Sequence, residues 1–190
     1  TRLMRTIGRI EKVNLVDLGF NELDSKIDSG ASTSALHAQY IKKVSIDDID
    51  YVKFRLLDKS HPAYEGTNIT LPLYKTKLVK SSNGFSQKRY SIQTRMKLGK
   101  KIYRIEFTLT DRKDMKYPIL LGTKFLRKKF DGFTIRTKQN SDNLDIVMAF
   151  PEFKVPMYEY LRNKSQEYIL SGLEKVPQNT ILLLKTNRRF

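Results

Sequence analysis

The segment that says most about possible chemistry is residues 26–38, where one carboxylate is surrounded by small and hydroxyl-bearing neighbours. This segment reads Lys-Ile-Asp-Ser-Gly-Ala-Ser-Thr-Ser-Ala-Leu-His-Ala, and its acid is Asp28. Small residues after an acid let backbone amides and hydroxyl groups approach the carboxylate closely. Asp, Ser and Gly are also common turn residues, so the tripeptide alone favours an ordinary turn over a reactive group.

A second segment, residues 117–126, is also distinctive. It reads Tyr-Pro-Ile-Leu-Leu-Gly-Thr-Lys-Phe-Leu, an apolar run that ends at Gly122 and leads into a predicted short helix. Between the two segments lies the sequence Ser-Ser-Asn-Gly at residues 81–84. It predicts the tip of a β-hairpin, because Asn-Gly readily adopts the positive φ angles of a tight turn.

Other catalytic chemistries find little support in the residue types present. Cysteine is absent, which excludes disulfides, thiolate nucleophiles and cysteine-bearing zinc sites. The histidines are His37 and His61, and neither belongs to a His-Glu-x-x-His motif. Structural or surface roles are favoured for both, since a zinc hydrolase needs three protein ligands and an open position. No phosphate-binding loop of the Gly-x-x-x-x-Gly-Lys-Ser/Thr type occurs, and we expect no cofactor.

Short segments of alternating apolar and polar residues must position these groups. Such alternation is typical of half-buried antiparallel strands, and it occurs at residues 51–56, 90–94 and 103–109. Residues 7–18 have a mixed pattern that favours a pair of strands over a helix. The chain is therefore predicted to be mainly β, with one domain that fills a single core.

The character of the chain changes after residue 140. Residues 144–150 predict a strand, residues 157–173 an amphipathic helix that starts beside Pro156, and residues 180–184 a final strand. We therefore expect one domain over residues 1–140 and a C-terminal α/β extension over residues 141–190. The extension is expected to pack on the domain or on a dimer interface.

The charge of the chain is strongly positive. The 36 Lys and Arg outnumber the 20 Asp and Glu and give a formal charge of +16, which attracts polyanions. Because the cations are spread over several segments, a solvated basic surface is favoured over a nucleic-acid site. No apolar run is long enough to cross a bilayer, so no membrane partner is expected. The start at Thr1 suggests a removed leader, and both cytoplasm and periplasm stay open as compartments.

Taken together, the acid-bearing loop, the hairpin and the Leu-Leu-Gly segment resemble the retropepsin-like aspartic peptidases. These enzymes combine an Asp-Thr/Ser-Gly loop with a hydrophobic-hydrophobic-Gly segment beneath it and a flap over the substrate. The resemblance implies a closed β-barrel with a short helix after the Leu-Leu-Gly motif. The residues that it implies for support of the loop are Thr33, Leu121 and Gly122. Those that it implies for substrate contact are Ala31, Ser82, Asn83 and Gly84.

The chain is more specifically similar to a bacterial family labelled ATP-dependent zinc proteases, which is thought to have the retropepsin fold. The similar motifs are Ile-Gly-x-x-Glu-x-Val from Ile7, the segment around Asp28, Ser-Ser-Asn-Gly, and Asp-Arg-x-x-Met-x-Tyr-Pro-x-Leu-Leu-Gly from Asp111. Two departures concern the bracing of the loop. Thr123 stands where the family has arginine, and Ser32 stands where viral retropepsins have an acid. Bracing is therefore expected to come from other groups.

The resemblance also implies a mechanism and a partner. Aspartic proteolysis needs two carboxylates that share one proton. The chain has one Asp-Ser-Gly loop, so the second Asp28 would come from a twofold-related copy. Ser29 would hydrogen-bond near the carboxyl pair, and Gly30 would leave room for the substrate backbone. The predicted function is that of a homodimeric aspartic endopeptidase acting on peptides or proteins, with a preference for acidic peptides that the positive charge motivates.

Three other functions stay open. A peptide-binding module without turnover is favoured by the missing braces at Ser32 and Thr123. The family label suggests a metal-dependent protease, and the basic charge leaves a nucleic-acid-binding barrel as the least favoured option.

Asp111 and Arg112 either rim the cleft or form a structural ion pair, and we prefer the ion pair.

Overall fold

The computed structural model describes residues 6–28, 30–80, 84–113, 116–127, 129–130, 132–134, 146–149 and 181–184. The contacts within the chain divide it into two compact units. The first unit comprises Thr1–Glu11, Lys26–Ser32 and Gly122–Phe190, and the second comprises Lys12–Ser25 and Thr33–Leu121. The Asp28 loop therefore belongs to the first unit, and the predicted flap belongs to the second.

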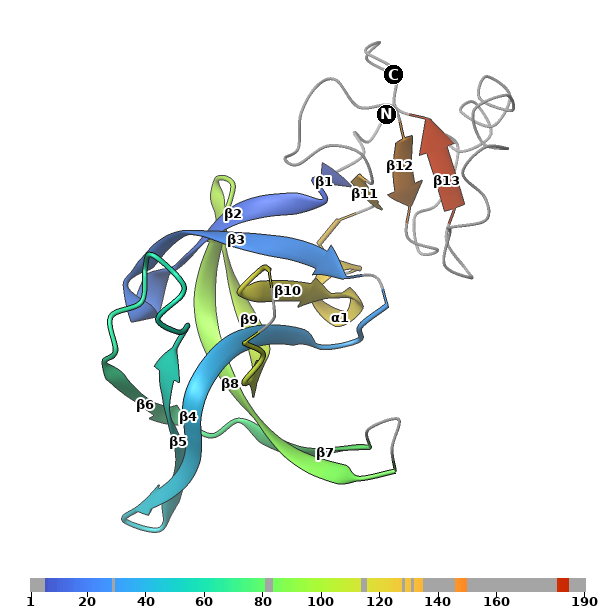
Figure 1. Ribbon diagram of the computed structural model, residues 1–190. Helices are drawn as coiled ribbons and strands as arrows, with labels where there is room; N and C mark the ends of the chain where they lie inside the picture. Colours follow the sequence, from blue (N-terminus) through green and yellow to red (C-terminus); the bar gives the residue numbers. More distant parts are fainter. Residues whose placement is uncertain are drawn as a thin grey trace. The chain divides into compact units, whose positions relative to one another are not determined.

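The larger sheet has nine strands and runs mainly through the second unit (Figure 1). Its strands are β2 (Ile10–Leu15), β3 (Phe20–Asp28), β4 (Ser34–Ile46), β5 (Ile49–Leu56), β6 (Asn68–Pro72), β7 (Lys75–Lys80), β8 (Ser86–Leu98), β9 (Lys101–Thr110) and β10 (Ile119–Gly122). Their order is β10-β3-β2-β8-β9-β4-β5-β6, and β7 pairs with β8. Because β4 also pairs with β10, the strands from β10 to β4 close on themselves. The predicted mainly β fold with a closed barrel is confirmed.

Side chains alternate along the barrel strands as the sequence patterns predict. In β8, Ile92, Met96 and Leu98 are buried, whereas Arg95 and Lys97 between them are exposed. A similar alternation buries apolar residues of β5, whereas the last four residues of β9, from Phe107 to Thr110, are all buried. One face of each strand thus fills the core of the barrel, and the burial of its apolar surface stabilises the fold. The strands predicted from these patterns are confirmed.

Two short hairpins depend on residues with positive φ angles. Asp47 and Asp48 connect β4 to β5 with φ angles of 51° and 61°. Two successive positive values are typical of a type I′ turn, whose twist matches that of the flanking strands. Between β8 and β9, Gly99 has a φ angle of 61° at the first central position of the turn. Glycine favours this conformation because it has no Cβ.

The hairpin predicted around Asn83-Gly84 is formed by β7 and β8. These strands pair in antiparallel register as far as Lys80 opposite Ser86. Gly84 lies in the connection with a φ angle of 80°, whereas Ser82 and Asn83 lie outside the described residues. The sequence therefore located the end of this hairpin correctly.

The N-terminal segment largely follows its predicted strand pair. It forms β1 (Thr6–Ile7) and β2, and its last residues instead form the short 3-10 helix η1 (Val16–Leu18). Gly19 ends this helix with a φ angle of 74°, the left-handed conformation that glycine commonly adopts after a helix.

The first unit contains a helix and a four-stranded sheet in its described part. The helix is α1 (Thr123–Leu126), and the strands are β1, β11 (Gly132–Thr134), β12 (Ile146–Ala149) and β13 (Ile181–Leu184), in that order. Strand β1 is parallel to β11, and the other neighbours are antiparallel. Helix α1 confirms the short helix predicted after the Leu-Leu-Gly motif.

Two of the three elements predicted in the C-terminal extension are present. Strands β12 and β13 confirm the strands expected at residues 144–150 and 180–184. The helix predicted at residues 157–173 lies outside the described residues. The packing of residues 141–190 on the domain or on a dimer interface stays a prediction. None of the helices in the described part of the chain is long and apolar enough to cross a membrane.

Candidate active site

Strand β3 carries Asp28 at its C-terminal end. Leu23, Ser25 and Ile27 are buried at alternate positions of this strand, and the half-buried Asp28 follows them. The amide of Ile27 donates a hydrogen bond to the carbonyl oxygen of Arg9 at 3.0 Å. The buried side chain and the backbone bond of Ile27 thus hold the chain immediately before the acid.

The loop after β3 folds back on the Asp28 carboxylate. The amide of Gly30 donates to Oδ1 of Asp28 at 3.0 Å, and the amide of Ala31 donates to the Asp28 carbonyl oxygen at 3.3 Å. A Cβ atom added to Gly30 would lie 3.4 Å from Oδ1 of Asp28, in van der Waals contact with it. A side chain there would therefore cover this side of the carboxylate, which glycine leaves open. Ser29 lies outside the described residues.

Helix α1 braces the far end of the same loop through its backbone. The amide of Thr123 donates to the carbonyl oxygen of Ala31 at 2.9 Å, and the amide of Lys124 donates to that of Ser32 at 3.0 Å. The first amides of a helix have no partner within the helix, so they are available to the loop. Gly122 precedes the helix in an extended conformation, with φ of -88° and ψ of 170°. These bonds use backbone atoms, so they do not depend on the side chain at position 123.

Thr33 and Leu121, which were predicted to support the loop, belong to the second unit. Leu121 is fully buried in β10. The hydroxyl oxygen of Thr33 accepts a hydrogen bond from Nζ of Lys77 at 3.2 Å, and the same Nζ lies 3.0 Å from the carboxylate of Glu106. The sequence did not single out Lys77, because nothing distinguishes it from the other lysines of residues 75–80.

A buried histidine organises another part of the second unit. His37 is 4% exposed, and its Nδ1 accepts a hydrogen bond from the amide of Arg112 at 3.0 Å. The proton of the neutral ring is therefore on Nε2, which donates to Oδ2 of Asp58 at 2.6 Å. Hydrogen bonds from Ser60 and from His37 lower the pKa of Asp58 to about 2. This geometry agrees with the structural role expected for His37.

His61 makes a local contact, since its Nδ1 accepts a hydrogen bond from the amide of Ala63 at 3.0 Å. Among the described residues, no three His, Cys, Asp or Glu side chains are grouped so that they could hold a metal ion.

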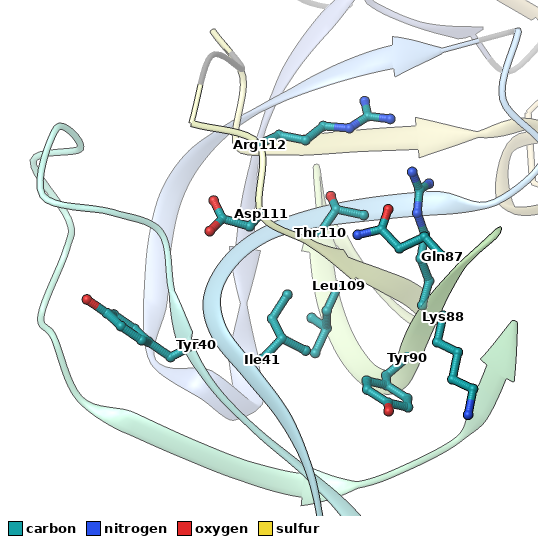
Figure 2. A pocket seen from close by; sticks show the side chains of 10 residues that line it. Tyr40, Ile41, Gln87, Lys88, Tyr90, Leu109, Thr110, Asp111 and Arg112 are labelled. Atoms are coloured by element: carbon teal, nitrogen blue, oxygen red, sulfur yellow. The ribbon is translucent and has the colours of Figure 1, made fainter. Parts of the chain in front are cut away.

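Asp111 and Arg112 both line a pocket that Figure 2 shows.

The predicted site residues are thus distributed over both units. Asp28, Gly30 and Ala31 share one loop of the first unit, which Gly122 and helix α1 adjoin through the bonds described above. The residues of the second unit are Thr33, Gly84 and Leu121. Those outside the described residues are Ser29, Ser82 and Asn83. The assignment of these residues to catalysis or substrate binding stays a prediction.

Two proteins named probable alpha-L-glutamate ligase match part of this chain. The one from Desulfotalea psychrophila is 32% identical over 118 residues, which cover 62% of this chain and 25% of that protein. The one from Shewanella pealeana is 35% identical over 127 residues, which cover 65% of this chain and 27% of that protein. The chain thus spans about a quarter of the length of these curated relatives.

Among solved structures, the protein Lpg0085 of unknown function from Legionella pneumophila is similar, with 30% identity and a TM-score of 0.49. The similarity covers 62% of this chain and 83% of that protein. A family model described as retropepsin-like aspartic endopeptidase RimB matches residues 6–131. This match extends from the start of β1 to just before β11 and includes the Asp28 loop, the flap hairpin and helix α1. The chain therefore belongs to the RimB-like family of retropepsin-like proteins.

Proposed function

We propose that this protein is an aspartic endopeptidase that acts as a homodimer, with one Asp28 carboxyl group from each copy. The observation that carries the proposal is the backbone-held Asp28 loop in a chain of the retropepsin-like family. The carboxylate ends a barrel strand, accepts the amide of Gly30 and is followed by a loop that two amides of α1 brace. A carboxylate held in this way is pre-organised for proton transfer.

In the proposed reaction, the two Asp28 carboxyl groups share one proton. The ionised group accepts a proton from water, and the water oxygen attacks the carbonyl carbon of the peptide bond. The protonated group donates its proton to the carbonyl oxygen, which gives a tetrahedral intermediate. When the C–N bond breaks, one Asp28 carboxyl group gives its proton to the leaving nitrogen, and a hydroxyl group of the intermediate returns a proton to the other Asp28 carboxylate, so the pair again shares one proton. Products are a new carboxyl terminus and a new amine.

The homodimer follows from the number of acid-bearing loops. The sequence contains a single Asp-Ser-Gly motif, and a twofold axis brings identical residues of two copies together. In this arrangement Ser29 supports the carboxyl pair, while Ala31, Ser82, Asn83 and Gly84 contact the substrate. The hairpin of β7 and β8 is the proposed mobile cover over the substrate. The exposure of its end at Gly84 supports this role.

Acidic peptides are the proposed substrates. A formal charge of +16 attracts polyanions. The curated relatives are named alpha-L-glutamate ligases, and this chain matches about a quarter of their length. This name describes a ligation of glutamate, and the similarity therefore supports glutamate-rich peptides as the substrates of this chain. We expect faster hydrolysis of an oligoglutamate than of an oligoglutamine of equal length, and equal rates would exclude this preference.

Replacement of the acid tests the peptidase mechanism. We expect Asp28→Asn to lower kcat by roughly a thousandfold, because asparagine cannot exchange the proton. Asp24→Asn is the matched control, since Asp24 lies on the same strand and pairs with Lys12 at the surface. Its activity should stay close to that of the parent. Peptide hydrolysis and sedimentation of all three proteins would be measured together.

The result separates the peptidase from the alternatives. Dimers in all three proteins, with activity lost only in Asp28→Asn, would support the proposal. Equal activity in parent and Asp28→Asn would overturn it and would favour a metal-dependent reaction if a chelator then abolished hydrolysis. A parent without turnover that also fails to bind a transition-state-mimicking inhibitor more tightly than a substrate peptide would indicate a non-catalytic binding module.

A further inference from the structure

The pocket in Figure 2 lies wholly within the second unit. It has a volume of about 290 Å³ and is lined by residues 40–41 of β4, 87–90 of β8, and 109–112 at and after the end of β9. Small-molecule sites usually have volumes of about 300–1,000 Å³. The pocket is therefore of a size that suits one side chain or a very small ligand.

Two polar atoms of the pocket residues lack an expected partner. Nε of Arg89 and Oγ1 of Thr110 are buried and have no hydrogen-bond partner within the described part of the chain. Thr110 is only 6% exposed, and Figure 2 shows its side chain among the pocket residues. Buried donors of this kind are nearly always bonded in folded proteins, because an unmade bond is costly. Both atoms could donate to the same ligand.

The charges around the pocket favour an anion. Lys88, Arg89 and Arg112 contribute three cationic groups, and Asp111 contributes one carboxylate. Burial lowers the pKa of Arg89, and the charge of Arg112 lowers it further. The two guanidinium groups thus repel each other across a partly buried site. A bound anion would relieve this repulsion.

The opposite wall of the pocket is shaped by a β-bulge. The register of β4 against β5 shifts between Gln39 and Lys42, and Tyr40 within the bulge has a φ angle of 54°. Positive φ is unfavourable for a bulky residue, and such strain is concentrated at functional sites. The bulge brings Tyr40 and Ile41 to the pocket, where Leu109 adds further apolar surface. This wall suits the methylene groups of a short aliphatic chain.

We propose that this pocket binds the carboxylate of a glutamate side chain in a peptide, an inference that rests on the proposed peptidase function. Arg89 donates two parallel hydrogen bonds to the carboxylate through Nε and a terminal nitrogen, since the guanidinium plane matches the two oxygens. The hydroxyl group of Thr110 donates a third bond. Ile41 and Leu109 contact the methylene groups, and Arg112 adds favourable charge. The pocket is thus a specificity site for acidic peptides.

Binding rather than hydrolysis tests this site. Calorimetry would measure the affinities of blocked tetraglutamate and tetraglutamine for the full chain carrying Asp28→Asn, so that no peptide is consumed. In this background we expect Arg89→Gln to weaken tetraglutamate binding about tenfold or more, because charge-assisted bonds are lost. Thr110→Val, which preserves the shape of the side chain, should weaken it by a smaller factor. Tetraglutamine binding should not change.

Arg104→Gln is the matched control, because Arg104 is exposed on β9 and lies outside the pocket lining. It removes the same charge, so we expect less than about a threefold loss of tetraglutamate affinity. Equal losses for Arg89→Gln and Arg104→Gln would show that only overall charge matters and would overturn the proposal. Thermal unfolding of each variant checks the fold, and Thr110→Val provides a second test if Arg89→Gln is unstable.

Two further measurements show whether the bound carboxylate belongs to a peptide or to a free dicarboxylate, and whether the glutamate site and the peptidase activity stand or fall separately. Glutarate that binds more tightly than tetraglutamate, with the same dependence on Arg89, would assign the pocket to a free dicarboxylate and overturn the peptide assignment. A parent protein that hydrolyses no peptide, but binds tetraglutamate through Arg89, would refute the peptidase and keep the site. Hydrolysis of tetraglutamate with a KM unaffected by Arg89→Gln would support the peptidase and refute the glutamate site.

Discussion

The Asp28 loop and the His37–Asp58 pair each hold an ionisable group, but different kinds of atoms hold them. Backbone amides of Gly30 and Thr123 secure the Asp28 loop. Side chains secure the second pair, where His37 donates to Asp58 and Ser60 donates to the same carboxylate. The first arrangement needs an N–H group at each position and the second needs particular side chains.

Because of this difference, the two regions should tolerate substitutions unequally. The Asp28 loop keeps its backbone bond although Thr123 stands where the family has arginine. An amide is present in every residue except proline, so the bond from position 123 to Ala31 is kept whichever other side chain stands there. The pair of His37 and Asp58 has no such freedom. His37 is buried, and loss of its partner would leave an N–H group without an acceptor.

Among changes to the groups that hold these two regions in place, removal of the bracing amide should have the largest effect. Thr123→Pro eliminates the N–H that reaches Ala31 while it preserves the helix, because proline is favoured at the first helical position. Gly122 already has the extended conformation that must precede proline. We expect kcat/KM to fall by about 10–100-fold, since small displacements of a catalytic group are costly.

Thr123→Ala is the control for this variant, because it keeps the amide and removes only the side chain. Its kcat/KM should remain within about twofold of the parent value if the backbone alone braces the loop. Parental activity in Thr123→Pro would contradict the backbone brace. A large loss in Thr123→Ala would instead assign the brace to the threonine side chain.

A second prediction concerns the side-chain pair. Asp58→Ala should lower the free energy of unfolding by about 1–3 kcal/mol, because the buried Nε2–H of His37 loses its acceptor. Asp50→Ala is the control, since its ion pair with Lys43 is exposed and should contribute less than about 1 kcal/mol. Urea unfolding at neutral pH measures both. Equal and small changes would show that the buried pair does not stabilise the second unit.

The smallest predicted effect is the pH dependence of this pair. Hydrogen bonds from Ser60 and His37 lower the pKa of Asp58 from 3.8 to about 2 in the folded protein. A carboxyl group with a lowered pKa stabilises the fold above its unfolded pKa, and this contribution is lost as pH falls through the folded value. We therefore expect the stability of the parent to approach that of Asp58→Ala between pH 4 and pH 2.

Unfolding by urea at several pH values within this range tests the prediction. The comparison with Asp58→Ala removes the contribution of other carboxyl groups, such as Asp17, whose pKa is also lowered, chiefly by a hydrogen bond from the Arg95 side chain. Parallel stability curves for the two proteins would contradict the role assigned to Asp58.

Local patterns predicted much of the fold and the acid-bearing loop. Alternation around Ile92 and Met96 indicated a strand, and Asn83-Gly84 indicated the end of a hairpin. The glycine after Leu121 indicated the start of helix α1. Each of these signals depends on neighbours in the sequence, since strand periodicity, turn conformation and helix initiation are local properties.

The partners of individual side chains were beyond such prediction. The bond from Lys77 to Thr33 joins residues 44 positions apart, and the bond from Arg112 to His37 spans 75 positions. Many lysines and arginines in this basic chain could have occupied those positions. Which of them does so depends on strand pairing and register, and these are decided by the packing of the whole barrel.

The sequence by itself determined the strands, the hairpin end and a carboxylate on a small-residue loop, because short-range sterics and hydrophobic alternation suffice for these features. Only the tertiary structure decided that α1 would brace the loop through amides and that β4 would bulge at Tyr40. It also decided that Nε of Arg89 and Oγ1 of Thr110 would be buried at one pocket, where neither has a hydrogen-bond partner among the described residues. These features arise when distant strands close into a barrel and bury whatever groups their register brings together.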